Sequence, residues 1–148
     1  MNPIYVSPGV RTPFVKSGGS FAGHVALELS VPEAKAMADI AAPDFLVWGQ
    51  VIPDVAVSNI GRELVFEAGL NPDTPAFSTV LACSTRFMGA IEAAGMIGKG
   101  GTHLALVGGA RILSQAAKEL QACPSGTYGI VSLCADGGQG TVALLQRV

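Results

Sequence analysis

Short apolar runs alternate with helical patterns along almost the whole chain, and glycine and proline separate them. The apolar runs predict strands at 3–6, 45–52, 77–82, 103–107, 128–133 and 141–145. The intervening patterns predict helices at 31–42, 54–69, 84–98 and 110–121. Such alternation is typical of a mostly parallel sheet with helices on both faces, whose last strand can return antiparallel. The sequence therefore predicts an α/β fold.

Composition narrows the classes of function. The length of 148 residues fits one domain, and a chain that is 49% hydrophobic and 14% charged has apolar surface to bury against a partner. A net charge of −2 without a basic cluster argues against nucleic acid. No apolar run reaches the roughly 18 residues of a membrane span, and the N-terminus does not resemble a secretion signal. The 3 cysteines are irregularly spaced, which predicts no disulfide scaffold and no metal site, and fits a reducing cytoplasm.

The most informative local feature is a cysteine at the predicted junction of a strand and a helix. Cys83 ends the apolar run 77–82, and Ser84 and Thr85 can cap the helix that follows. Amide groups in the first turn of a helix carry partial positive charge, which stabilises the reactive thiolate form of a cysteine. The corner is therefore a candidate covalent catalyst. The alternative is an inert structural cysteine, which is common in proteins.

Two separated segments resemble the thiolase family. The first is the N-terminal signature at 6–14 and 18–23, with the later sequence Asn59-Ile60-Gly61-Arg62. The second is the C-terminal sequence 133–140, which resembles the family's cysteine–glycine motif. Cys83 matches the position of the family's nucleophilic cysteine. The resemblance covers nearly the whole chain and implies a thiolase-like single domain, 1–148.

The resemblance implies a reaction on acyl-CoA thioesters that needs no cofactor. Cys83 would accept the acyl group as a thioester, and Cys134 would move the proton at the substrate α-carbon. Backbone N–H groups at Cys83 and near Asp136, together with Gly137 and Gly138, would bind the substrate and the oxyanion. The resemblance also implies that the helix after the nucleophile packs against a partner, so we expect a homodimer.

The sequence also departs from the family pattern. Residues 1–109 resemble the N-terminal half of a thiolase, whereas 110–148 resemble the last helix and hairpin of the C-terminal half. The family's Gly-His-Pro and Asn-Glu-Ala-Phe motifs and its loop domain are absent, and Asp136 replaces a glycine. Two hypotheses follow: a thiolase-type acyltransferase, or a catalytically silent thiolase-like module that folds and dimerises without turnover.

Other residues have ordinary interpretations. His24 and His103 do not match the family histidine and are expected to be polar or capping residues, and Cys123 lies in a predicted turn. The glycines at 137, 138 and 140 could equally provide the positive φ of a hairpin. Arg11, Lys16 and Arg86 could contact phosphates, but scattered cations are usually solvated, and we expect the same here.

Overall fold

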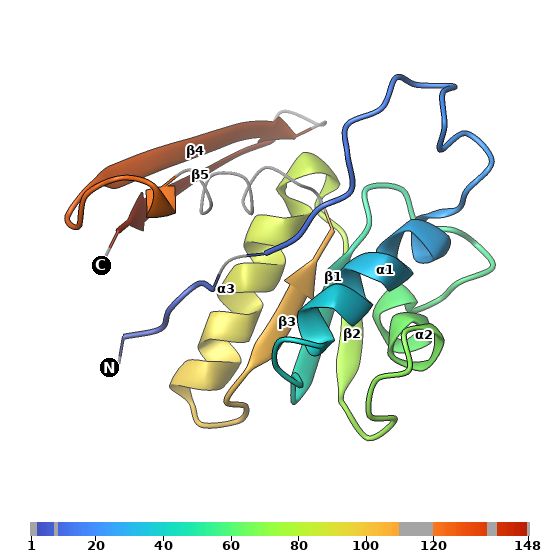
Figure 1. Cartoon of the computed structure of the whole chain (residues 1–148), viewed down its shortest axis with the longest axis horizontal. Helices are drawn as coiled ribbons and strands as arrows, with labels where there is room; N and C mark the ends of the chain where they lie inside the picture. The colour runs from blue at the N-terminus through green and yellow to red at the C-terminus, as the bar shows by residue number, and fades with distance from the viewer. Residues whose placement is uncertain (1–2, 8, 110–119, 136–138, 148) are drawn as a thin grey trace.

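The computed structural model describes residues 3–7, 9–109, 120–135 and 139–147 (Figure 1). The first part of the chain forms α1 (Ala26–Ala38), β1 (Phe45–Gly49), α2 (Ile60–Glu67) and β2 (Ala76–Thr79). It continues with a short 3₁₀ helix, η1 (Ala82–Ser84), and then α3 (Thr85–Gly98) and β3 (Ala105–Gly108). The last elements are β4 (Tyr128–Ala135) and β5 (Gln139–Gln146).

The strands form two sheets rather than one. A parallel sheet has the order β2-β1-β3, with Leu46 of β1 opposite Ala76 of β2 and Leu106 of β3. The strands β4 and β5 form a separate antiparallel hairpin. The α/β prediction is confirmed, including the antiparallel return of the last strand. Each hairpin strand extends slightly beyond its predicted limits, since Ala135 still pairs with Gln139.

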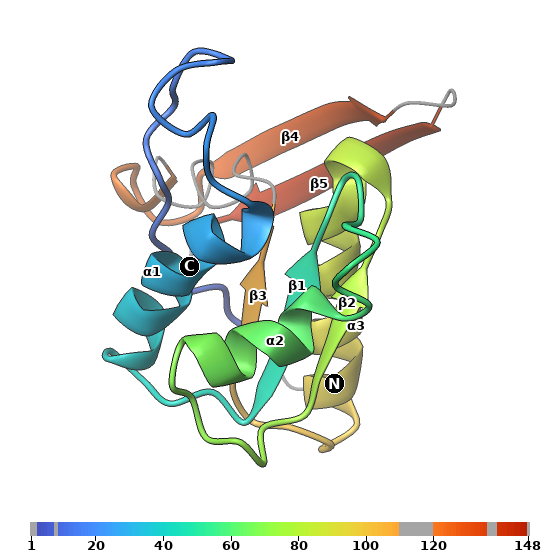
Figure 2. The same cartoon turned by 90° about the vertical axis from the view of Figure 1, so that its right-hand side faces the viewer.

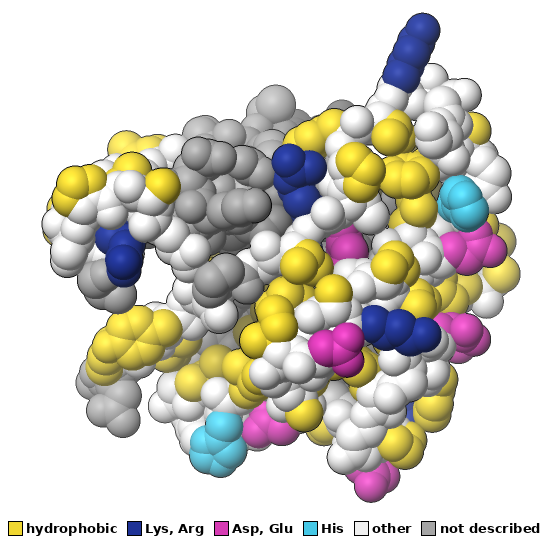
Figure 3. All heavy atoms as spheres, viewed as in Figure 1, with side chains coloured by type: hydrophobic (Ala, Val, Ile, Leu, Met, Phe, Trp, Pro, Cys, Tyr) yellow, Lys and Arg dark blue, Asp and Glu magenta, His cyan; other side chains and the backbone are white. Residues whose placement is uncertain are grey.

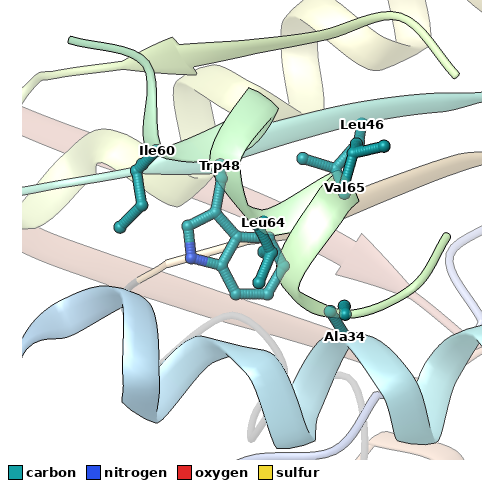
Figure 4. Packing of buried hydrophobic residues seen from close by; sticks show 7 residues of the cluster. Ala34, Leu46, Trp48, Ile60, Leu64 and Val65 are labelled. Carbon is teal, nitrogen blue, oxygen red and sulfur yellow. The ribbon is translucent and has the colours of Figure 1, made fainter. Parts of the chain in front are cut away.

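Strand β1 is the centre of the molecule because helices cover both of its faces. Leu46 and Trp48 point into one cluster with residues of α1 and α2, whereas Phe45 and Val47 point into a second cluster beneath α3. Figure 2 shows α1 and α3 on opposite sides of the sheet, and Figure 4 shows the first cluster from close by. Burial on both faces explains why this strand is apolar without alternation.

Both N-terminal helices begin elsewhere than predicted. Helix α1 begins at Ala26, so Pro32 lies inside it and not in its first turn. The side chain of Glu28 accepts the Val25 N–H at 3.3 Å and thereby supports the earlier start. Helix α2 is capped by Asn59, whose side chain accepts the Arg62 N–H. The predicted cap, Asp54, instead accepts the Ala56 N–H in a local turn before the helix.

The predicted strand at 3–6 is wrong: residues 3–7 belong to no strand. A strand requires a hydrogen-bonded neighbour, and among the described residues β3 pairs only with β1. The apolar side chains of Ile4, Tyr5 and Val6 are correspondingly exposed. The predicted helix 110–121 lies outside the described residues except for its end at Leu120, which is buried.

The hairpin lies beside the N-terminal end of α3. Figures 1 and 2 agree that the carboxyl end of β4 is the end that approaches this helix. The residues of β4 contact η1. The fold thus brings a strand from near the C-terminus to the turn that carries Cys83.

Candidate active site

Cys83 lies in η1, between the end of β2 and the start of α3, and it is exposed. The sequence-based prediction of a strand–cysteine–helix corner is therefore confirmed in its local structure. Ala82 has φ of 44°, a left-handed conformation that costs an L-residue about 1–2 kcal/mol. The turn is therefore strained at the residue that precedes the cysteine, and the surrounding contacts must hold it.

Thr85 supplies those contacts. Its hydroxyl oxygen accepts the Leu81 N–H at 2.8 Å and lies 2.6 Å from the carbonyl oxygen of Ala82, to which it can donate. The same hydroxyl lies 3.3 Å from the carbonyl oxygen of Gln50, at the end of β1. Thr85 is fully buried. The sequence indicated only a helix cap at Thr85; in the structure this residue joins the cysteine turn to the central strand.

Close packing fixes α3 against the sheet. A Cβ atom on Gly49 would overlap Cγ2 of Thr85. A Cβ on Gly89 would lie 3.1 Å from Val47 Cγ1 and 3.2 Å from Val107 Cγ1. Both glycines let the helix that follows Cys83 approach the parallel strands, which limits the movement of the turn.

Cys134 belongs to β4, where it pairs with Gly140 of β5. This hairpin is separate from the parallel sheet whose strand β2 leads to Cys83. Because β4 contacts η1, the two cysteine-bearing segments still meet at the N-terminal end of α3. The predicted substrate residues Asp136, Gly137 and Gly138 lie outside the described residues.

Neither histidine belongs to the turn that carries Cys83. His24 precedes α1 and pairs with Glu28, with 3.1 Å between Nδ1 and Oε2. His103 precedes β3, at the amino ends of the parallel strands, and its backbone N–H donates to Asp44. The contact of His24 is the polar role that the sequence suggested. Within the described ranges, no cluster of three or more His, Cys, Asp or Glu residues gathers to hold a metal ion.

Arg86 corrects a prediction, because it is buried, with 7% exposure, and not solvated. Burial lowers the pKa of its guanidinium, and the nearby charge of Glu33 offsets this in part. The residue comes just after Cys83, but its side chain lines a groove that Cys83 does not line. The sequence around Arg86 contains no pattern that predicts its burial.

The charged side chains on one face of the molecule are dispersed. On the face seen in Figure 3, Lys and Arg side chains stand apart from one another. No helix in the described part of the chain is both long and apolar enough to cross a membrane. The site is therefore defined by an exposed cysteine at a braced turn of an α/β protein.

Comparison with known proteins shows which family this chain belongs to. The family model described as "Thiolase, N-terminal domain" matches residues 4–132. The chain belongs to this thiolase family. Among its relatives, the 3-ketoacyl-CoA thiolase of Shewanella baltica (strain OS155 / ATCC BAA-1091) is 38% identical over 112 residues, and that of Shewanella pealeana is 36% identical over 112 residues.

The alignments cover 72% of this chain but 26% of each of these two relatives, so the chain spans about a quarter of their length. The solved acetyl-CoA acetyltransferase of Bacillus anthracis superposes with a TM-score of 0.64 at 23% identity. The superposition covers 72% of this chain and 28% of the acetyltransferase chain. That similarity shows the shared fold. The division of the chain at residue 109 stays a prediction.

Proposed function

We propose that this chain is a thiolase-type acyltransferase domain that acts on acyl-CoA thioesters through a cysteine acyl-enzyme. It follows the lineage of acetyl-CoA acetyltransferases and 3-ketoacyl-CoA thiolases. The observation that carries the proposal is the exposure of Cys83 on a strained turn at the start of α3. Family membership supports it, since the relatives are named 3-ketoacyl-CoA thiolases.

In the first step, the thiolate of Cys83 attacks the carbonyl carbon of the acyl-CoA thioester. A bond forms between Sγ and the acyl carbon, and the bond from that carbon to the sulfur of coenzyme A breaks. The coenzyme A thiolate leaves with the electron pair. The N–H groups at the start of α3 favour the negative charge on the attacking sulfur and on the carbonyl oxygen. No cofactor takes part.

In the second step, Cys134 acts as the acid and base. It takes a proton from the α-carbon of a second acyl-CoA, whose carbanion attacks the acyl carbon on Cys83 and releases the Cys83 thiolate. The approach of β4 to η1 supports this pairing of cysteines. Asp136, Gly137 and Gly138 would line the substrate and oxyanion side of the same site.

The working form in this proposal is a homodimer, and the outer face of α3 is its interface. Ile91 is 61% exposed on this helix. A single thiolase-like domain, 1–148, that pairs through this face buries this side chain. The setting is the cytoplasm and fatty acid metabolism, where a reducing environment keeps Cys83 as a thiol.

Light scattering at micromolar concentration tests the dimer. We expect the mass of two chains for the wild type and a shift toward one chain for Ile91→Glu. Ile52→Glu is the matched control, because Ile52 is 85% exposed but lies outside α3. A single-chain mass for the wild type contradicts the dimer and leaves acyl transfer untouched.

Acylation tests the chemistry. The protein is incubated with acetyl-CoA or acetoacetyl-CoA, and peptide mass spectrometry locates the added acyl mass. We expect it on Cys83, absent in Cys83→Ala and retained in Cys123→Ala, since Cys123 is a cysteine outside the proposed site. A folded dimer that accepts no acyl group is the silent module and contradicts the proposal.

A further inference from the structure

Strand β3 is an open edge of the parallel sheet. Among the described residues it pairs with β1 alone, so alternate backbone N–H and C=O groups along it face away from the sheet. A groove of about 550 Å³ runs along this strand, and residues 104–107 all line it. Pockets that hold ligands have volumes of about 300–1,000 Å³, so the groove has room for a bound segment. The groove therefore presents a strand edge to whatever binds in it.

Within the described ranges, the chain's own segments do not complete this edge. Residues 3–7 also line the groove, but they belong to no strand. The strands β4 and β5 pair with each other in a separate sheet. An open strand edge beside an apolar groove is a site at which another polypeptide can add a strand.

Helices flank the position that an added strand would take. Residues of α1 and α3 line the groove, and Figure 2 shows these helices on opposite sides of the sheet. The lining from α3 consists of small or apolar side chains, namely Ala90, Ala93, Ala94 and Ile97. An added strand would thus be buried on both faces, as β1 is. Strands buried on both faces are apolar without alternation, so the groove favours an unbroken apolar run over an amphipathic strand.

The charged residues of the groove do not favour an occupant of either sign. Arg86 and Glu33 both line it, and Glu33 lies close enough to act on the charge of the Arg86 guanidinium. A charged side chain that entered the groove would meet both signs at once and would lose its hydration. The part of the occupant that enters the groove should therefore be uncharged.

We propose that the groove is a strand-addition site, in which an extended, uncharged and apolar segment of a separate polypeptide pairs with the open edge of β3. The backbone of this segment hydrogen-bonds to β3, and its side chains pack against α1 on one face and α3 on the other. Cys83 does not line the groove, so this site is separate from the proposed acyl transfer.

A synthetic peptide tests the site on the whole wild-type chain. The core of this parent peptide alternates valine and isoleucine, its capped ends carry lysine for solubility, and it is used below its aggregation concentration. Trp48 is the single tryptophan and lines the groove, so its fluorescence reports binding. We expect saturable binding, and we expect amides on the open edge of β3 to exchange with solvent at least about tenfold more slowly when the peptide is bound.

Two matched peptides separate strand pairing from simple apolar contact. The first has the same side chains but carries N-methyl groups on its core amides, so it cannot donate to β3 and should bind at least about tenfold more weakly. The second has threonine in place of each valine, which keeps the shape but buries hydroxyl groups, and it should also bind at least about tenfold more weakly. Equal binding of the N-methylated and parent peptides overturns the proposal.

A variant that fills the groove tests the location. Ala94→Leu should weaken the parent peptide about tenfold. Ala26→Leu, at an exposed helical position outside the groove, should bind it like the wild type. If Ala94→Leu does not fold, the comparison of peptides on the wild type decides alone.

Three further results overturn the proposal. They are the absence of binding to the wild type, unchanged binding in a folded Ala94→Leu, and slow exchange of the open-edge amides of β3 before any peptide is added. The last result would show that the chain itself fills the groove, or that a second copy does so if the protection rises with protein concentration. Acylation of Cys83 is measured separately, so the failure of either proposal is distinguished from the failure of the other.

Discussion

The hydroxyl oxygen of Thr85 accepts the backbone N–H of Leu81 at 2.8 Å and thereby closes the turn that contains Cys83. The turn contains a left-handed Ala82, so its geometry depends on contacts rather than on local preference. Thr85 is buried, and its hydroxyl also lies 3.3 Å from the carbonyl oxygen of Gln50, which follows β1, so it links the cysteine turn to the central strand.

Thr85→Val should loosen this turn. Valine has nearly the shape of threonine but cannot accept the Leu81 N–H, so the free energy of unfolding should fall by about 1–3 kcal/mol. The rate of acylation at Cys83 should fall as well. Urea denaturation and mass spectrometry measure the two effects. Thr85→Ser keeps the hydroxyl and should restore most of the acylation rate; a rate equal to that of Thr85→Val would contradict the bracing role.

Asp44 should make stability depend on pH in the acid range. Hydrogen bonds from the Thr102 hydroxyl and from the N–H groups of Leu104 and His103 lower the pKa of its carboxyl from 3.8 to about 2, although burial opposes them. Because the folded-state pKa is lowered, the stabilisation is present above about pH 4 and is lost as the pH falls toward 2. The pH dependence of the urea midpoint in this window should be weaker in Asp44→Asn. Identical pH profiles for the two proteins would show that Asp44 does not cause the loss of stability at acid pH.

Substitution by alanine should change stability in opposite directions at Gly95 and Gly49. Gly95 in α3 has open space where a Cβ atom would lie, so Gly95→Ala should stabilise the protein by about 1 kcal/mol through helix propensity. Gly49→Ala would overlap Thr85 and should destabilise the protein by about 1–3 kcal/mol. Thermal unfolding compares the pair, and a stable Gly49→Ala would show that α3 can move away from the sheet.

Asn59 should stabilise the packing of α2 against β2, because its side chain hydrogen-bonds to both elements. Its Oδ1 accepts the Arg62 N–H at 3.1 Å and the Ser78 hydroxyl at 2.9 Å, and its Nδ2 donates to the Ala76 carbonyl. Asn59→Ala should cost about 1–3 kcal/mol in unfolding free energy. Asn59→Asp keeps the cap but loses the donor to Ala76, so chemical denaturation should place it between the wild type and Asn59→Ala. If Asn59→Ala unfolds at the same denaturant concentration as the wild type, Asn59 does not stabilise this packing.

Periodicity and turn chemistry were sufficient to predict much of this fold. The unbroken apolar run of β1 is buried on both faces, as the α/β interpretation requires. Gly69 ends α2 with φ of 67°, the conformation for which glycine is favoured after a helix. The corner at Cys83 could be predicted because strand, cysteine and helix patterns follow one another directly.

Features that depend on contacts across the fold could not be predicted. Pro32 normally marks a first turn, but contacts of Glu28 extend α1 before it. The choice of Asn59 over Asp54 as cap depends on Ser78 and Ala76, which are distant in sequence. Arg86 is buried on α3, and the charge that acts on its guanidinium comes from Glu33 on another helix, α1. The meeting of β4 with η1 likewise depends on packing that no local pattern encodes.

The most direct test of the central claim is the site and chemistry of acyl attachment. The wild type, Cys83→Ala and Cys123→Ala are treated with acetyl-CoA, digested and mapped with and without neutral hydroxylamine, which cleaves thioesters. We expect one hydroxylamine-sensitive acetyl group on Cys83 in the wild type and in Cys123→Ala, and none in Cys83→Ala. Acetyl mass on Cys123 alone, or no acetyl mass on a folded wild-type protein, would contradict it.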